Sequence, residues 1–288
     1  MRLNRFDTSK IKVTGGRGSA GRRAGGIGCG TIIIAIIAAL VFGVDPMQTI
    51  GMIEGGQQQP TTAQEQTGGL TEEQVCSSSA YATEACNALT SLNETWTPVF
   101  ASANIRFQDP TLRLYPSGPV STRGCGNASS AAGPFYCPAD QTIYIDTAFY
   151  DTMAQRMGAG GDFARYYVMA HEYGHHIQNL TGIADQVRSI QSRNPSQRNQ
   201  LQVRMELQAD CYAGVWAGKN RSLIEPGDMQ EGLRAASAIG DDTLQRRAGQ
   251  RINPENFTHG TSQQRMEALR RGLESANGAA CDVYFDFN

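Results

Sequence analysis

The residues best suited to chemistry lie in one short run, His171-Glu172-x-x-His175. On a helix, positions i and i+4 share a face one turn apart, so both imidazoles can reach a single metal ion. Glu172 follows the first histidine and can take a proton from a water molecule beside that ion. Three of the four histidines of the chain fall in this cluster. The spacing predicts one catalytic Zn²⁺ with a glutamate general base.

A second helical pair supplies the acids that such a site needs. Glu206 and Asp210 are also four residues apart. A catalytic zinc usually has three protein ligands and one open position, so we expect Glu206 to be the third ligand. We expect Asp210 to accept the free ring N–H of a ligating histidine, His171, and so to fix its tautomer. A solvated acidic face is the alternative, but the surrounding apolar residues predict a buried helix, in which unpaired acids are costly.

The oxyanion of an acyl-transfer reaction needs a hydrogen-bond donor. Our candidate is His259, the one histidine outside the cluster, in a Gly/Thr/Ser-rich loop. The alternative is a structural histidine at the start of the helix predicted from Thr261. Tyr173 and Tyr144 are further candidate donors that the sequence does not rank. His176 points about 100° away from its neighbour, which favours a supporting or surface role.

Several helices and a small sheet must position these residues. A 3.6-residue apolar period predicts a helix over 162–180 for the first pair and over 196–218 for the second. Strand-like runs occupy 105–107, 111–115 and 142–146. The last of these is expected either to be an edge strand to which a peptide adds or an ordinary internal strand. Further helices are expected at 72–90, 91–100, 147–157, 182–192, 228–239, 242–250 and 261–275. The fold class is α+β.

The N-terminal region predicts a membrane anchor. Residues 24–44 carry no charge, and roughly 17–25 such residues span a bilayer. Residues 1–25 hold seven basic side chains and one acid, so the positive-inside rule predicts a single pass with a cytoplasmic N-terminus and a periplasmic or extracellular domain. A cleaved signal peptide is the alternative. We expect a basic cytoplasmic tail over 1–23, a flexible linker over 45–72 and a folded domain over 73–288.

Six cysteines fall in the predicted outer domain, where an oxidising compartment would favour disulfides. Close spacing favours Cys76–Cys86 and Cys125–Cys137, which leaves Cys211–Cys281. Buried free thiols are the alternative.

Composition excludes one class of function. The net charge is −2, and beyond residue 25 the chain carries 18 basic and 26 acidic residues. A basic nucleic-acid binder is therefore not expected.

The motifs resemble those of known zinc metallopeptidases. His171-Glu172-x-x-His175 with Glu206-x-x-x-Asp210 is similar to the gluzincin arrangement. The chain resembles more closely the bacterial membrane-anchored neutral zinc metallopeptidase family, over about 75–285 and the N-terminal anchor. The resemblance implies a zincin-like fold with an active-site helix, a glutamate helix and a mixed sheet. The stretches that carry it are Gly133–Asp140, His171–Gln178, Glu206–Trp216 and Phe257–Ser262.

Two functional interpretations remain open at this stage. The first is a membrane-anchored zinc peptidase that hydrolyses peptide or protein substrates, with a cell-wall amidase as a related hydrolase. The second is a non-catalytic, metal-stabilised binding or chaperone-like module outside the cytoplasm. Glu172 favours the first, because a structural zinc site is normally closed by four ligands and needs no carboxylate beside an open position.

Overall fold

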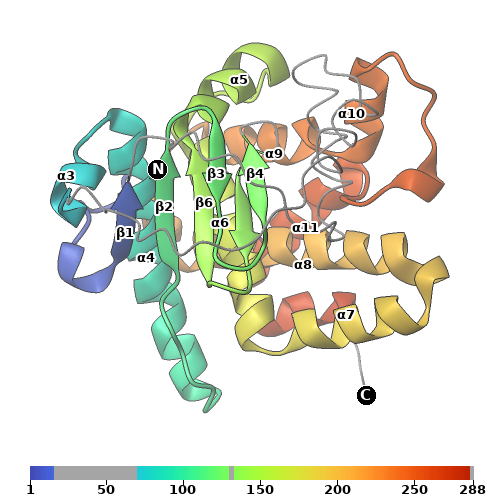
Figure 1. The fold of residues 1–288 in the computed structure, drawn as a ribbon, viewed down its shortest axis with the longest axis horizontal. Helices are drawn as coiled ribbons and strands as arrows, with labels where there is room; N and C mark the ends of the chain where they lie inside the picture. The colour runs from blue at the N-terminus through green and yellow to red at the C-terminus, as the bar shows by residue number, and fades with distance from the viewer. Residues whose placement is uncertain (16–69, 130–132, 286–288) are drawn as a thin grey trace, which may run out of the picture.

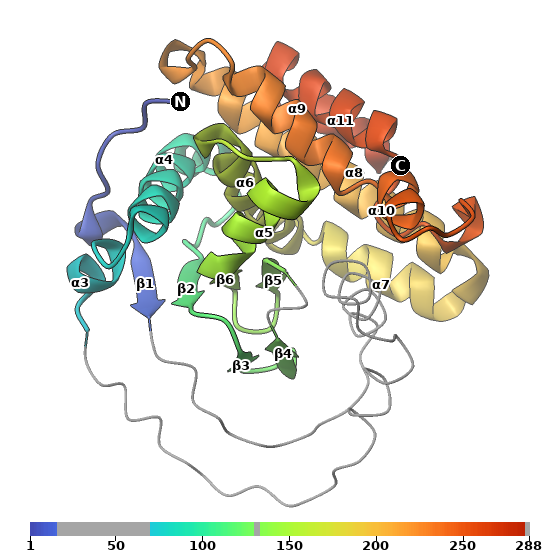
Figure 2. The same ribbon diagram turned by 90° about the horizontal axis from the view of Figure 1, so that it is seen from above.

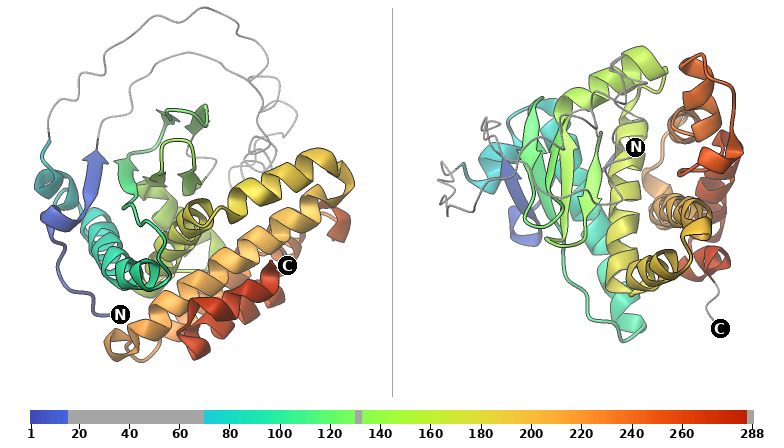
Figure 3. Two further views of the ribbon diagram at one scale, coloured as in Figure 1. Left: turned by 90° about the horizontal axis from the view of Figure 1, so that it is seen from below. Right: turned by 45° about the vertical axis from the view of Figure 1, so that its right-hand side comes forward.

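The computed structural model describes residues 1–15, 70–129 and 133–285. A small sheet, a middle layer containing helix α6 (Asp162–Leu180) and an outer layer containing α8 (Arg198–Lys219) follow one another (Figure 3, right). This arrangement agrees with the predicted α+β class. The predicted membrane helix at 24–44 lies outside these residues. Within the portion described, no helix is long and apolar enough to cross a bilayer.

The main sheet has the strand order β1-β2-β6-β5. Parallel pairing joins β1 (Lys12–Gly15) to β2 (Thr111–Tyr115) and β2 to β6 (Thr142–Asp146), whereas β5 (Phe135–Cys137) is antiparallel to β6. Strands β3 (Pro119–Ser121) and β4 (Asn127–Ser129) form a separate antiparallel hairpin. The interpretation of 142–146 as an edge strand is therefore wrong. Every residue of β6 is buried, because strands flank it on both sides.

The helices that follow residue 146 begin and end close to the predicted positions. The chain forms α3 (Glu72–Cys76), α4 (Ala80–Ser102), α5 (Thr147–Met157), α7 (Ile183–Arg193), α9 (Asp228–Ala238), α10 (Asp241–Arg247) and α11 (Ser262–Ser275), besides α6 and α8 (Figure 1). Thr71 caps α3 as a capping box with Gln74. The boundary expected near residue 90 is absent, since α4 is continuous there. The expected strand at 105–107 does not form.

Glycines let the central helices approach until their backbones touch. A Cβ atom on Gly174 of α6 would lie 2.8 Å from the Ala209 Cα of α8. A Cβ atom on Gly272 of α11 would lie 1.9 Å from the Cys211 carbonyl oxygen of α8. Helix α8 is therefore held between α6 and α11. The first contact also brings the histidine helix next to the glutamate helix.

Residues 1–15 belong to the folded unit, which corrects the expected tail over 1–23 and the expected domain start at residue 73. Strand β1 extends the sheet beyond β2. Phe6, Ile11 and Val13 are buried in the main core. Figure 2 shows this segment running beside α3 and α4. The physical reason is that the apolar side chains alternate with basic ones, so the segment can bury one face.

The six outer cysteines form three disulfides, Cys76–Cys86, Cys125–Cys137 and Cys211–Cys281, as predicted. The third joins the middle of α8 to the 3₁₀ segment Gly278–Tyr284, which follows α11 in the chain. It lies immediately after Asp210 in the sequence and supports the helix that carries both acids.

Candidate metal centre

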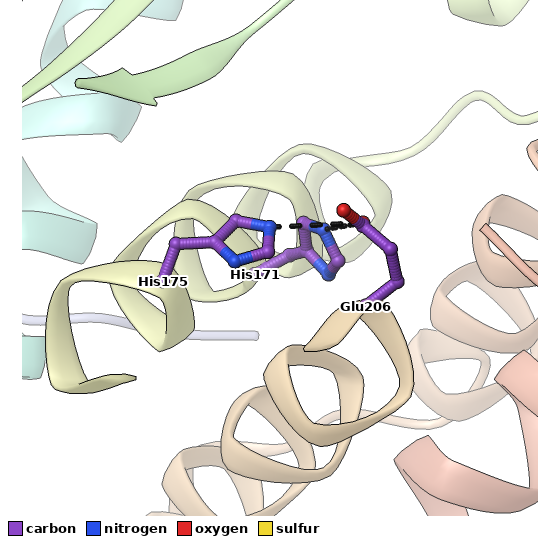
Figure 4. Close-up of side chains that lie close together, drawn as sticks. All are labelled: His171, His175 and Glu206. Carbon is purple, nitrogen blue, oxygen red and sulfur yellow. Dashed lines mark hydrogen bonds and ion pairs between the residues drawn. The ribbon is translucent and has the colours of Figure 1, made fainter. Parts of the chain in front are cut away.

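His171, His175 and Glu206 converge between α6 and α8 (Figure 4). The His171 Nε2 atom lies 3.1 Å from Glu206 Oε2, and the His175 Nε2 atom lies 3.6 Å from the same oxygen. One donor atom from each of the three residues lies within 4.8 Å of the other two. The two pairs predicted from helical spacing thus meet at one point.

A buried network orients His171. Its Nδ1–H donates to Asp210 Oδ1 at 2.8 Å, which leaves Nε2 facing Glu206. Tyr167 donates to the same Asp210 oxygen at 2.6 Å. The Arg265 guanidinium contacts both carboxylate oxygens, at 2.8 and 2.9 Å. Asp210 therefore lies where we expected it. Tyr167 and Arg265 were not predicted from the sequence as parts of the site.

Gln178 orients the second histidine. The His175 Nδ1–H donates to Gln178 Oε1 at 2.9 Å. The Gln178 amide then donates to the Met205 carbonyl oxygen of α8 at 2.8 Å and to Gln208 Oε1 at 3.0 Å. Gln178 is fully buried. Its role was not predicted, although a glutamine three residues after a ligand and on the core face of the helix is a signal that the sequence contains.

Nearby positive charges lower the pKa values of both Glu206 and Asp210. Burial opposes ionisation of Glu206, but His175 and His171 outweigh it and hold the pKa of Glu206 well below its usual range. Burial likewise opposes ionisation of Asp210, but Arg265 and His171 lower its pKa to about 2. Both acids are therefore anionic at neutral pH, and Glu206 can act as a ligand.

Glu172 lies on the same helix and is also buried. Burial raises the pKa of Glu172 above its usual range, and the nearby His171 and His175 oppose that rise. A raised pKa brings a carboxylate closer to the value suited to proton transfer near neutral pH. The environment of Glu172 thus differs from that of Glu206, although both are glutamates within one site.

A second acid holds the loop that carries His259. Asp241 Oδ2 accepts the backbone N–H groups of Thr258, His259 and Gly260 at 2.6–2.9 Å. Its other oxygen, Oδ1, accepts the His259 Nδ1–H at 3.1 Å. The loop packs on α8, because a Cβ atom on Gly260 would meet Val203 and Leu207. These two residues flank Glu206, and the charge on His259 contributes to the lowered pKa of Glu206.

The other candidate donors are bonded elsewhere. Tyr173 donates to Asn93 Oδ1 at 2.7 Å, and Tyr144 donates to Asp140 Oδ2 at 2.7 Å. The helix predicted from Thr261 is capped by the Thr261 side chain itself. Among the three candidate oxyanion donors, His259 is the one whose loop packs on the helix that carries Glu206.

His176 supports the sheet edge rather than the metal. Its Nε2–H donates to the Gln108 carbonyl oxygen at 2.7 Å, so Nδ1 accepts from the Tyr136 hydroxyl at 3.0 Å. Burial lowers the pKa of His176 to about 4, which keeps the ring neutral. His176 thereby connects α6 to strand β5 and to the segment before β2, which agrees with a supporting role.

The residues fit a zinc ion by the chemistry of their donors. Two imidazole nitrogens and a carboxylate oxygen form a ligand set typical of catalytic zinc, with one position left open. The other ring nitrogen, Nδ1, of His171 and of His175 donates to a hydrogen-bond acceptor, as in most histidines that bind zinc. Gln202 donates to Glu206 Oε1 at 2.9 Å, which leaves Oε2 toward the histidines.

Comparison with known proteins gives one family and several relatives. The family described as "Putative neutral zinc metallopeptidase" matches residues 3–284, and thus takes in β1 as well as the metal centre. The protein YpfJ of Escherichia coli K12, named as uncharacterized, is 42% identical over 255 residues, covering 88% of this chain and 86% of YpfJ. The uncharacterized protein Rv2575 of Mycobacterium tuberculosis H37Rv is 42% identical over 207 residues, or 67% of each chain. No solved structure matches significantly.

Proposed function

Because the chain belongs to the neutral zinc metallopeptidase family, we propose that it hydrolyses peptide bonds with Glu172 as general base and His259 as oxyanion donor. The observation that carries this proposal is the convergence of His171, His175 and Glu206 beside a buried Glu172. The proposed substrates are peptides or proteins, and a nucleic-acid partner is not proposed.

The three converging residues would hold the zinc ion. When bound, zinc supplies a Lewis acid that polarises the scissile carbonyl group and lowers the pKa of its water molecule to about 7. Asp210 and Gln178 accept from the two Nδ1 atoms, which would leave both Nε2 atoms free to bind the ion. Neither residue needs to move during turnover, because each is fixed by contacts to α8 or α11.

Proton transfer is assigned to Glu172. Its carboxylate accepts the proton of the attacking water and later delivers that proton to the leaving amine. Burial suits both steps, since it raises the pKa of Glu172 and so makes the carboxylate a stronger base.

Oxyanion stabilisation is assigned to His259 together with Asp241. Asp241 Oδ1 accepts from Nδ1 of His259, so Nε2 is the ring nitrogen left to face a developing negative charge. The three backbone bonds to Asp241 Oδ2 keep the loop rigid.

Substrate binding is assigned to strand β5. In the described part of the chain β5 pairs on one side only, with β6, and its Tyr136 hydroxyl is bonded to His176 and Asn179 of the active-site helix. An extended peptide adding to this edge would run beside α6. The three disulfides support a location outside the cytoplasm.

The substitution Glu172→Gln tests the proposal. It removes the general base and keeps the ligands, so the purified full-length variant should bind zinc stoichiometrically and hydrolyse peptides about 10²- to 10⁴-fold more slowly. Zinc is measured by elemental mass spectrometry and hydrolysis with a mixed peptide library.

The control for this test is His175→Ala, which should lose both zinc and hydrolysis. Full activity of Glu172→Gln would contradict the mechanism. Stoichiometric zinc without hydrolysis in the wild-type protein would favour the non-catalytic binding module instead.

A further inference from the structure

The N-terminal segment, residues 1–15, carries an inference about how the chain is placed relative to a membrane. We infer that this segment lies in the same compartment as the metal centre. The charge distribution of the sequence alone predicts the opposite, a cytoplasmic N-terminus and an external domain. Three features of the segment argue for one shared compartment.

The first feature is the strand pairing. Lys12, Val13 and Thr14 pair in parallel with Thr111, Leu112 and Arg113. Neighbouring strands lie about 4.8 Å apart, whereas the hydrocarbon core of a bilayer is about 30 Å thick. Two strands of one sheet therefore cannot lie on opposite sides of a membrane.

The second feature is the set of hydrogen bonds from the segment to α3 and α4. The Phe6 N–H donates to Asn87 Oδ1 at 2.8 Å, and the Val13 N–H donates to Glu72 Oε1 at 3.2 Å. The Asn93 amide donates to the Lys10 carbonyl oxygen at 2.9 Å. Since the Asn93 side-chain oxygen also accepts from Tyr173 of α6, the segment is connected to the active-site helix through one side chain.

The third feature is charge complementarity. Arg2 pairs with Glu225 at 2.6 Å, Arg5 with Glu73 at 2.7 Å and Lys10 with Glu94 at 2.8 Å. Three of the seven basic side chains that suggest a cytoplasmic tail thus have acidic partners on the domain. The N-terminal 25 residues are thus basic overall, with seven basic side chains against one acid, and the remainder is acidic overall, with 26 acids against 18 basic side chains.

Together these contacts place residues 1–15 and the metal centre on the same side of any membrane that the chain contacts. The apolar stretch 24–44 lies between the two parts in the sequence and outside the described residues. The inference does not depend on peptidase activity, because its evidence lies in the packing of the segment.

Thiol labelling of the full-length chain tests the inference. In a Cys29→Ala background, single cysteines are introduced at Ser9 and, separately, at Ser196, both of which are exposed. Spheroplasts are treated with a membrane-impermeant maleimide before or after lysis. We expect the two positions to behave alike, labelled in both conditions or only after lysis. Labelling of one position before lysis and of the other only after it would overturn the inference.

A cross-link provides an independent measurement. Thr14 and Arg113 are paired residues in neighbouring strands, within the Cα separation that a disulfide allows. The double variant Thr14→Cys/Arg113→Cys should form a disulfide in isolated membranes treated with a mild oxidant, as detected by peptide mapping. Thr14→Cys/Ser196→Cys is the control and should not. Equal absence of the cross-link in both variants, with all thiols reactive, would contradict the pairing.

Discussion

Asp210 and Arg265 form an ion pair in the interior, and the partners depend on each other. Arg265 is 1% exposed and Asp210 is fully buried. Removal of one partner from such a pair leaves an uncompensated charge in a region of low polarity. Arg265 is not one of the three converging ligands. It supports the metal centre through Asp210, which orients His171.

At this scale we predict that Arg265→Met lowers the free energy of unfolding by about 3–5 kcal/mol. Urea denaturation measures the change. Arg246→Met is the matched control, since Arg246 is exposed and lies 3.7 Å from Asp242, and its loss should cost at most about 1 kcal/mol. Equal losses of unfolding free energy in the two variants would show that the buried ion pair stabilises the fold no more than the exposed one.

A second residue-scale prediction concerns Asp241. Asp241→Asn keeps an oxygen for the backbone N–H groups but removes the carboxylate beside His259. We expect kcat to fall about 10- to 100-fold with zinc content unchanged, because His259 loses the acceptor that orients its ring. Asp242→Asn is the control, since Asp242 bonds Ser262 instead. An unchanged kcat in Asp241→Asn would remove His259 from the mechanism as drawn here.

At the scale of elements, the contact between α6 and α8 determines whether the two ligand pairs meet. Gly174 lies between Glu172 and His175 and touches the backbone of Ala209, next to Asp210. A methyl group at this position would lie 2.8 Å from the Ala209 Cα atom, closer than van der Waals contact, so the two helices would have to shift apart. The ligands on the two helices would then separate with them.

We therefore predict that Gly174→Ala lowers stability by about 1–3 kcal/mol through overpacking and weakens zinc binding. Competition with a zinc chelator measures the affinity. Gln186→Ala, on the exposed face of α7, should change neither quantity. If Gly174→Ala bound zinc as the wild type does, the close approach would not be needed for the site.

The helices and the two strands β2 and β6 could largely be predicted from the sequence, whereas β1 and the strand order of the sheet could not. Helices such as α6 and α8 are long and periodic, and their paired residues at i and i+4 reveal the site locally. The strands are short, and β1 joins the sheet through a partner about a hundred residues away, which no local pattern shows. Gln178 and Arg265 were not identified for a similar reason: each acts through a partner on another helix.

At the scale of the whole molecule, the N-terminal segment and the rest of the described chain share one core. Such a molecule should unfold as one unit. A change in the N-terminal segment should then lower the stability of the entire domain, although the metal centre lies on other elements.

We predict that Phe6→Ala lowers the free energy of unfolding of the full-length chain by about 3 kcal/mol, because Phe6 is 7% exposed. Leu70→Ala, at a residue that is 57% exposed, should stay within about 0.5 kcal/mol of the wild type. Tryptophan fluorescence in urea reports the transition, since Trp96 and Trp216 are buried in the same core. No change in Phe6→Ala would mean that the segment is not part of the cooperative unit.

The parallel pairing of β1 with β2 also has a consequence for biogenesis. The ribosome produces Lys12 long before Thr111, its partner in the ladder. The first strand must therefore remain unpaired while about a hundred further residues are synthesised, and high contact order of this kind slows folding. During that interval its apolar face is available to chaperones or to neighbouring nascent chains. The ladder from β1 through β2 to β6 can therefore be completed only after Asp146 has emerged from the ribosome.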